Sequence, residues 1–129
     1  MIKQVFYIKK YWKVIVYYNI DYDLFYIIKK DLVDINLPIR RIANLKHNLQ
    51  TNSYGVTISN IKEKVSIVCF NYHDNKNEYL STIVHEAEHV KQHILKHYNI
   101  VDEDENAAYT IGYIVKQMYD VLTDIICCD

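Results

Sequence analysis

Four segments of the chain carry the pattern of β-strands. Residues 3–8 and 12–18 are rich in β-branched and aromatic residues, and a short polar break between them predicts a hairpin. Further along, residues 56–59 and 65–70 show the same composition, with a tight turn expected near residues 60–63. The sequence therefore predicts a small sheet of about four strands, antiparallel or mixed.

Apolar residues recur at helical spacing in the remaining segments. Residues 22–35 predict a first helix, and Pro38 opens a second that runs to about Leu49. A longer helix is expected from about Asn77 to Tyr98, and a C-terminal helix follows the acidic segment near residue 102. We predict an α+β fold for residues 1–129 as one domain, with two N-terminal helices before the longer helix.

The charge of the chain excludes one class of partner. The formal net charge is −1 over 129 residues, which gives no electrostatic support for wrapping nucleic acid. The second predicted helix has a basic face with Arg40, Arg41 and Lys46, which we interpret as a solvated surface. We expect no nucleic-acid partner.

The cysteines and the N-terminus bear on the compartment. Cys69, Cys127 and Cys128 are an odd number without CxxC spacing, so we expect free thiols and no disulfide framework. Charges interrupt the apolar residues of the N-terminus, and no stretch has membrane-spanning length. We therefore expect a cytoplasmic protein without a membrane partner.

The central motif is the segment from His85 to His89, which reads His-Glu-Ala-Glu-His inside the long predicted helix. Two histidines four residues apart lie on one face of a helix, so that both imidazoles can reach one metal ion. The HExxH pattern is typical of zinc peptidases, in which the histidines bind Zn²⁺ and the glutamate acts as general base. The pattern predicts His85 and His89 as zinc ligands and Glu86 as the catalytic base.

A helical wheel separates the motif from an apolar stripe, which is expected to face the core: Leu80, Ile83, Val84, Ala87, Val90 and Ile94. The wheel places His85 and His89 roughly opposite this stripe, with Glu86 beside them on the polar side. Any amphipathic surface helix would show the same division. His89 and His93 form a rival pair at the same spacing, but no glutamate follows His89.

A catalytic zinc site uses three protein ligands and leaves a position open for water. The spacing HExxHxxGxxH would require a glycine and a histidine where this chain has Gln92 and Leu95. A third histidine five residues after the motif is also missing, because Ile94 stands there. A carboxylate from the following helix is therefore the expected third ligand.

The acidic segment at residues 102–105 offers four carboxylates for this role. On spacing alone Glu105 is favoured and Asp104 comes next, with Glu103 and Asp102 behind them. Glu105 also has a structural interpretation, since it could close a capping box with Asp102 as the N-cap. Ala108 and Gly112, four residues apart, predict a close approach of this helix to its neighbour.

The two segments together resemble the small HExxH zinc metallopeptidases of phages and mobile elements. The residues that carry the resemblance are Thr82-Ile-Val-His-Glu-Ala-Glu-His-Val and Glu105-Asn-Ala-Ala-Tyr-Thr-Ile-Gly-Tyr, with similar strands before them. The resemblance covers about residues 50–120 and implies a minimal zincin-like fold. It implies a gluzincin-type ligand set of His85, His89 and Glu105, and a host cytoplasmic location if the protein is phage-encoded.

We therefore predict a hydrolase that cleaves peptide or protein substrates with a zinc-activated water. Tyr109 is a candidate stabiliser of the oxyanion, as are Tyr113 and His73, although each could instead pack or cap. An extended substrate could pair with a strand edge near residues 65–70. The alternative is a non-catalytic protein-binding module, an inhibitor or adaptor, in which zinc is structural or absent.

Overall fold

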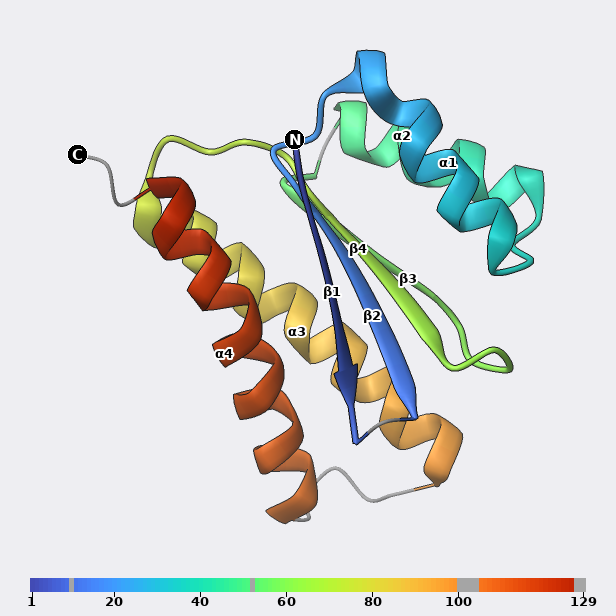
Figure 1. Ribbon diagram of the computed structural model, residues 1–129, viewed down its shortest axis with the longest axis vertical. Helices are drawn as coiled ribbons and strands as arrows, with labels where there is room; N and C mark the ends of the chain where they lie inside the picture. The colour runs from blue at the N-terminus through green and yellow to red at the C-terminus, as the bar shows by residue number, and fades with distance from the viewer. Residues whose placement is uncertain (10, 52, 100–104, 127–129) are drawn as a thin grey trace.

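The computed structural model describes residues 1–9, 11–51, 53–99 and 105–126, which form a four-stranded sheet with helices on both faces (Figure 1). The strands are β1 (Ile2–Ile8), β2 (Trp12–Tyr18), β3 (Gly55–Asn60) and β4 (Val65–Phe70). The helices are α1 (Phe25–Asp34), α2 (Ile39–Thr51), α3 (Lys76–Tyr98) and α4 (Glu105–Ile126), and a short 3₁₀ turn at Tyr22–Leu24 precedes α1. The α+β prediction and its four strands are confirmed.

The sheet is mixed, with the strand order β1-β2-β4-β3. The hairpin partners β1 and β2 are antiparallel, β2 and β4 are parallel, and β3 is antiparallel to β4. Strand β4 is therefore interior, and the prediction of a free edge at residues 65–70 is wrong. The edges of the described sheet are β1 and β3.

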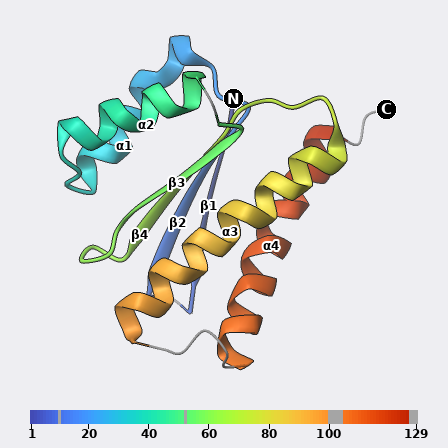
Figure 2. The ribbon, with the colours of Figure 1, turned by 180° about the vertical axis from the view of Figure 1, so that it is seen from behind.

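Each face of the sheet has its own apolar core. Helices α1 and α2 cover one face, and α3 and α4 cover the other, as Figures 1 and 2 show from opposite sides. The α3–α4 side includes Trp12, Val14 and Phe70, whereas Ile15 and Ile67 belong to the α1–α2 side. This division follows from the alternation of side chains along a strand, and it explains why β2 and β4 are apolar at nearly every position.

Helix α4 packs with a different face from the one that its small residues predict. Its buried residues are Ala107, Thr110, Ile114, Met118 and Leu122. Ala108 and Gly112 are exposed, and a Cβ added at Gly112 would meet nothing within 4 Å. The predicted close approach through these two residues is wrong, because the larger apolar residues occupy the contact with α3 and the sheet.

No helix in the described part of the chain combines the length and the apolar character that crossing a membrane requires.

Candidate metal centre

Helix α3 is fixed at both ends and along one side, which sets the direction of the motif. Asn75 caps its start by accepting hydrogen bonds from the backbone N–H groups of Asn77 and Glu78. Asn99 ends it in the left-handed conformation (φ 55°) that commonly closes helices. The buried stripe runs through Tyr79, Ile83, Ala87, Val90 and Ile94.

Val84 departs from the predicted stripe, because it is 42% exposed. The prediction that it belongs to the core is wrong.

The two motif histidines converge. Their Nε2 atoms lie 3.2 Å apart, and the rings meet edge to face with centroids 4.9 Å apart. Two imidazole nitrogens bound tetrahedrally to zinc at 2.0–2.1 Å would be separated by about 3.3 Å. The arrangement of His85 and His89 thus fits the spacing of two ligands on one metal ion.

Glu86 is buried rather than solvated, with only 4% of its surface exposed. Thr57 on β3 donates its hydroxyl to Glu86 Oε1 at 3.0 Å, and the same hydroxyl lies 3.3 Å from the Glu86 carbonyl oxygen. The other carboxylate oxygen, Oε2, lies 4.0 Å from His85 Nε2. The helical wheel wrongly placed Glu86 on the polar side because it could not anticipate a polar partner on β3.

A glycine allows β3 to approach α3 at this point. A Cβ at Gly55 would lie 2.8 Å from Thr82 Cγ2, 3.0 Å from Glu86 Cγ and 3.1 Å from Phe70 Cδ1. Beside it is a cavity of about 290 Å³ that His85 and Glu86 line together with Ser81, Thr82 and residues 53–55. Glu86 therefore has a carboxylate oxygen near His85 and also lines an open space.

The structure does not bring a third ligand to the histidines. In the described ranges no three His, Cys, Asp or Glu side chains are grouped closely enough to hold one metal ion. Glu105 is exposed as the first residue of α4. The rival candidates at residues 102–104 lie outside the described residues. Glu105 as a zinc ligand stays a prediction.

Comparison of the chain with protein-family models, curated proteins and solved structures finds no match in any of the three.

The candidate oxyanion residues from the sequence lie apart from the motif. Tyr109 is 72% exposed on α4 and lines a different cavity, together with Tyr113, whose hydroxyl donates to the Tyr7 carbonyl. His73 accepts a hydrogen bond from the Asn75 backbone and contacts the Tyr54 ring at 4.6 Å between centroids. None of the three lines the His85 cavity.

Sequence reasoning missed Tyr54, which lines the cavity of His85 and Glu86 and is 57% exposed. Tyr54 falls within residues 50–120, which the resemblance to the metallopeptidases covers, and that resemblance was the available signal. A phenol at this position can donate a hydrogen bond into the cavity.

The rival pair His89 and His93 does not converge in the same way, because a hydrogen-bonded chain holds His93 to the sheet. Trp12 Nε1 donates to Ser66 Oγ at 2.9 Å, Ser66 Oγ lies 2.7 Å from Ser59 Oγ, and Ser59 Oγ lies 2.6 Å from His93 Nδ1. Since the indole can only donate, the chain is satisfied when Ser59 donates to His93 Nδ1.

Burial lowers the pKa of His93, and the charges of His89, Lys96 and Arg41 lower it further. The lowered pKa favours neutral His93 near pH 7, a form whose Nδ1 can accept a hydrogen bond from Ser59.

Cys69 is fully buried, and burial, with a smaller effect of the Glu86 charge, raises its thiol pKa to about 12. It is a free thiol in the structure, as predicted. Cys127 and Cys128 lie outside the described residues.

Proposed function

We propose that this protein is a zinc-dependent peptidase with a zincin-like fold, in which His85 and His89 bind the metal and Glu86 is the general base. The observation that carries the proposal is the convergence of the two imidazoles at 3.2 Å beside a buried carboxylate. A surface pair of histidines on an ordinary amphipathic helix would not require a buried glutamate between them.

The residues of the proposed site have separate catalytic and positioning roles. A bound zinc ion supplies an acidified water and a polarised carbonyl. Glu86 takes a proton from the attacking water at Oε2 and returns it to the leaving amine. Thr57 donates its hydroxyl to Oε1 and keeps the carboxylate in one orientation. Tyr54 lines the adjoining cavity, and its phenol would donate a hydrogen bond to the oxyanion there.

An extended substrate fits the free edge of β3 better than any other strand. Strand β3 pairs only with β4 in the described sheet, and it lies against α3 beside Glu86. A peptide that adds to this edge would cross the cavity that His85 and Glu86 line. The substrate class is therefore a peptide or an unfolded protein segment.

The test is metal analysis together with hydrolysis of a random-sequence peptide mixture. Wild-type protein should contain one zinc per chain, Glu86→Gln should keep it, and His89→Ala should lose it. Wild-type protein should cleave the mixture, and Glu86→Gln should lower the rate at least 100-fold. Zinc content that is unchanged in His89→Ala, or a wild-type chain without zinc, contradicts the proposal.

The same experiment separates the alternative of a binding module. If wild-type protein and Glu86→Gln bind zinc equally well and neither cleaves the peptide mixture, the protein is a non-catalytic module with a structural metal. The proposal requires hydrolysis that depends on Glu86.

The Glu105 prediction has its own variant. Glu105→Gln should lower zinc affinity at least tenfold if this carboxylate completes the site. Equal zinc affinity in wild-type protein and Glu105→Gln would contradict its role as ligand. In the neighbouring variant Asn106→Asp, which leaves Glu105 in place, zinc should be retained.

A further inference from the structure

A second cavity lies at the other end of β3, away from the paired histidines. Its volume is about 420 Å³, and it is lined by residues from the α1–α2 connection, the start of α2, the end of β3, the β3–β4 turn and the C-terminal part of α3. The residues that matter here are Arg41, Ser59, Asn60, Lys62, His93 and Lys96.

The lining of this cavity is cationic. Arg41, Lys62 and Lys96 come from three different elements, and no Asp or Glu belongs to the lining. None of the three forms a salt bridge with another residue of the described ranges. Three positive side chains without a negative partner repel one another, and a bound anion would remove this electrostatic cost.

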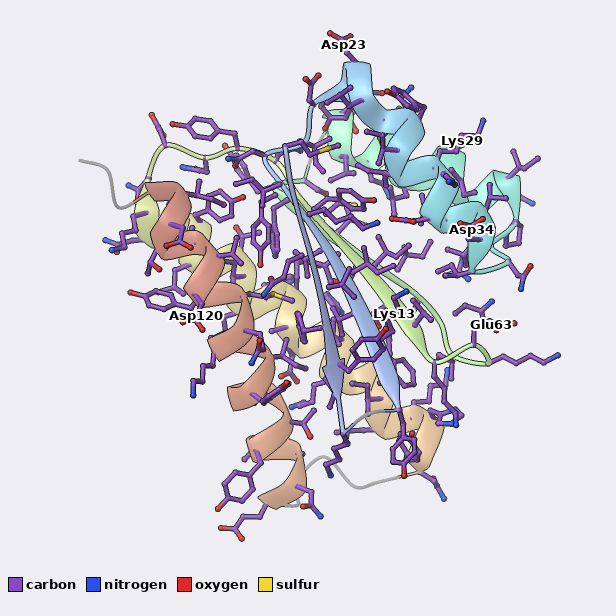
Figure 3. The ribbon with its side chains drawn as sticks, in the orientation of Figure 1. Lys13, Asp23, Lys29, Asp34, Glu63 and Asp120 are labelled. Atoms are coloured by element: carbon purple, nitrogen blue, oxygen red, sulfur yellow. The ribbon has the colours of Figure 1, made fainter. Side chains whose placement is uncertain are left out.

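One carboxylate lies beside the cavity without lining it. Glu63, which follows Lys62, accepts a hydrogen bond at 3.2 Å from Nδ2 of Asn36, a lining residue. Figure 3 shows Glu63 at the β3–β4 turn. His93 also lines the cavity, and its pKa is lowered first by burial and then by nearby charges that include Lys96 and Arg41.

The two cavities lie along one line that β3 and α3 define together. Strand β3 begins at Gly55 in the cavity of His85 and ends at Asn60 in the cationic cavity. On α3, seven residues separate His89 from Lys96, which is about 10 Å along the helix axis. An extended peptide covers that length with about three residues.

We propose that the cationic cavity is a subsite for an acidic side chain of the substrate, about three residues from the bond that is cleaved. The inference rests on the proposed function, because it assumes a peptide that lies along β3. It adds a substrate class: extended peptides with an aspartate or glutamate at that distance. Arg41 and Lys96 bind the carboxylate from opposite sides of the cavity, and Lys62 adds its charge from the turn.

The binding test does not require catalysis. Fluorescein-labelled hexaglutamate is titrated into the Glu86→Gln protein at low salt and followed by fluorescence anisotropy, with hexaglutamine as the uncharged probe. When Arg41→Gln and Lys96→Gln are added to the Glu86→Gln protein, hexaglutamate binding should weaken at least tenfold. Hexaglutamine should bind weakly to the protein with and without these two substitutions.

The matched control removes two charges elsewhere. Lys29 and Lys30 are exposed on α1, where Figure 3 labels Lys29, and changing both to Gln alters the net charge by the same amount. The affinity of this control for hexaglutamate should be within twofold of that of the Glu86→Gln protein. Equal weakening in the two double variants, or equal binding of hexaglutamine, overturns the inference.

The cleavage test uses the random-sequence peptide mixture and identifies the cleaved bonds by mass spectrometry. Wild-type protein and the Lys29/Lys30 control should favour Asp or Glu about three residues from the cleaved bond, and Arg41→Gln/Lys96→Gln should lose that preference. Cleavage without an acidic preference overturns this inference and leaves the proposed function standing. Absence of any cleavage rejects the proposed function, while the anisotropy titration still decides whether the cavity binds acidic peptides.

Discussion

At the scale of single residues, the contact that most directly shapes the site joins Thr57 to Glu86. A buried carboxylate needs a hydrogen-bond donor, and here one hydroxyl from the neighbouring strand supplies it to Oε1. This contact leaves Oε2 directed towards His85 and the cavity. The orientation of the proposed base therefore depends on a residue outside the motif.

We predict that Thr57→Val lowers peptide hydrolysis about tenfold by kcat, with unchanged zinc content and little change in KM. The valine keeps the shape of the side chain but leaves Glu86 without its donor, which should also lower the free energy of unfolding by about 1–3 kcal/mol. Steady-state kinetics and urea unfolding measure the two effects. Thr57→Ser keeps the hydroxyl and should behave like wild-type protein; equal losses in both variants would contradict this role.

A second prediction concerns the phenol of Tyr54. Tyr54→Phe should lower kcat about tenfold or more and leave zinc binding unchanged, because it removes only the donor into the cavity. Tyr109→Phe, on a different cavity, serves as the control and should retain full activity. If Tyr109→Phe loses activity and Tyr54→Phe does not, Tyr109 and not Tyr54 would be the oxyanion donor.

At the scale of elements, the approach of β3 to α3 positions the site. The chain has two glycines, and they lie in opposite environments: Gly55 is enclosed by side chains of α3 and β4, whereas Gly112 faces open space on α4. The same substitution at both positions separates steric crowding from helix propensity.

Gly55→Ala should lower the free energy of unfolding by about 1–3 kcal/mol, because its Cβ would crowd Thr82 and Glu86. It should also reduce hydrolysis, since Glu86 must shift. Gly112→Ala should raise the free energy of unfolding by about 0.5–1 kcal/mol, as expected for alanine within a helix. Urea unfolding of both variants checks the pair, and similar shifts of the same sign would contradict the described packing.

The elements themselves could be predicted from the sequence, but the way they pack was harder to foresee. Strand β4 is buried at five of its six positions, and such a continuous apolar run is typical of a central strand. That signal argued against a free edge at residues 65–70. The small residues of α4 predict the wrong packing face, because the larger apolar residues Ile114 and Met118 are the ones that are buried.

Spacing along the sequence was enough to predict the positions of some residues of the site but not of others. The i, i+4 rule predicted that His85 and His89 share a face, and they converge. The burial of Glu86 and the place of Tyr54 depend on β3, which is about thirty residues away along the chain. Periodicity within one helix holds no information on such a contact.

At the scale of the whole molecule, His93 links α3 to the middle of the sheet through Ser59, Ser66 and Trp12. Because its folded pKa lies below the ordinary value of 6.5, the unfolded chain binds the proton more readily. The stability that neutral His93 allows is therefore present above the unfolded pKa of 6.5 and is lost as the pH falls below 6.5 and through the lower folded pKa.

We predict that the free energy of unfolding of wild-type protein falls more between pH 7.5 and pH 5.5 than that of His93→Gln. The variant lacks the group whose protonation opposes folding, although other histidines titrate in both proteins. Urea unfolding at the two pH values, with His47→Gln as an exposed control, measures the difference. An identical pH dependence in wild-type protein and His93→Gln would contradict it.

The parallel pairing of β2 with β4 has a consequence for how the protein opens. Strand β3 belongs to the crossover between these two strands, and among the described residues its one strand partner is β4. Local unfolding can thus release β3 without separating β2 from β4, and its amides should exchange hydrogen faster than theirs. Because Thr57 leaves with β3, such an excursion would free the Glu86 carboxylate while the histidines stay on an intact helix. The proposed base would then have an inactive state that requires no change in metal binding.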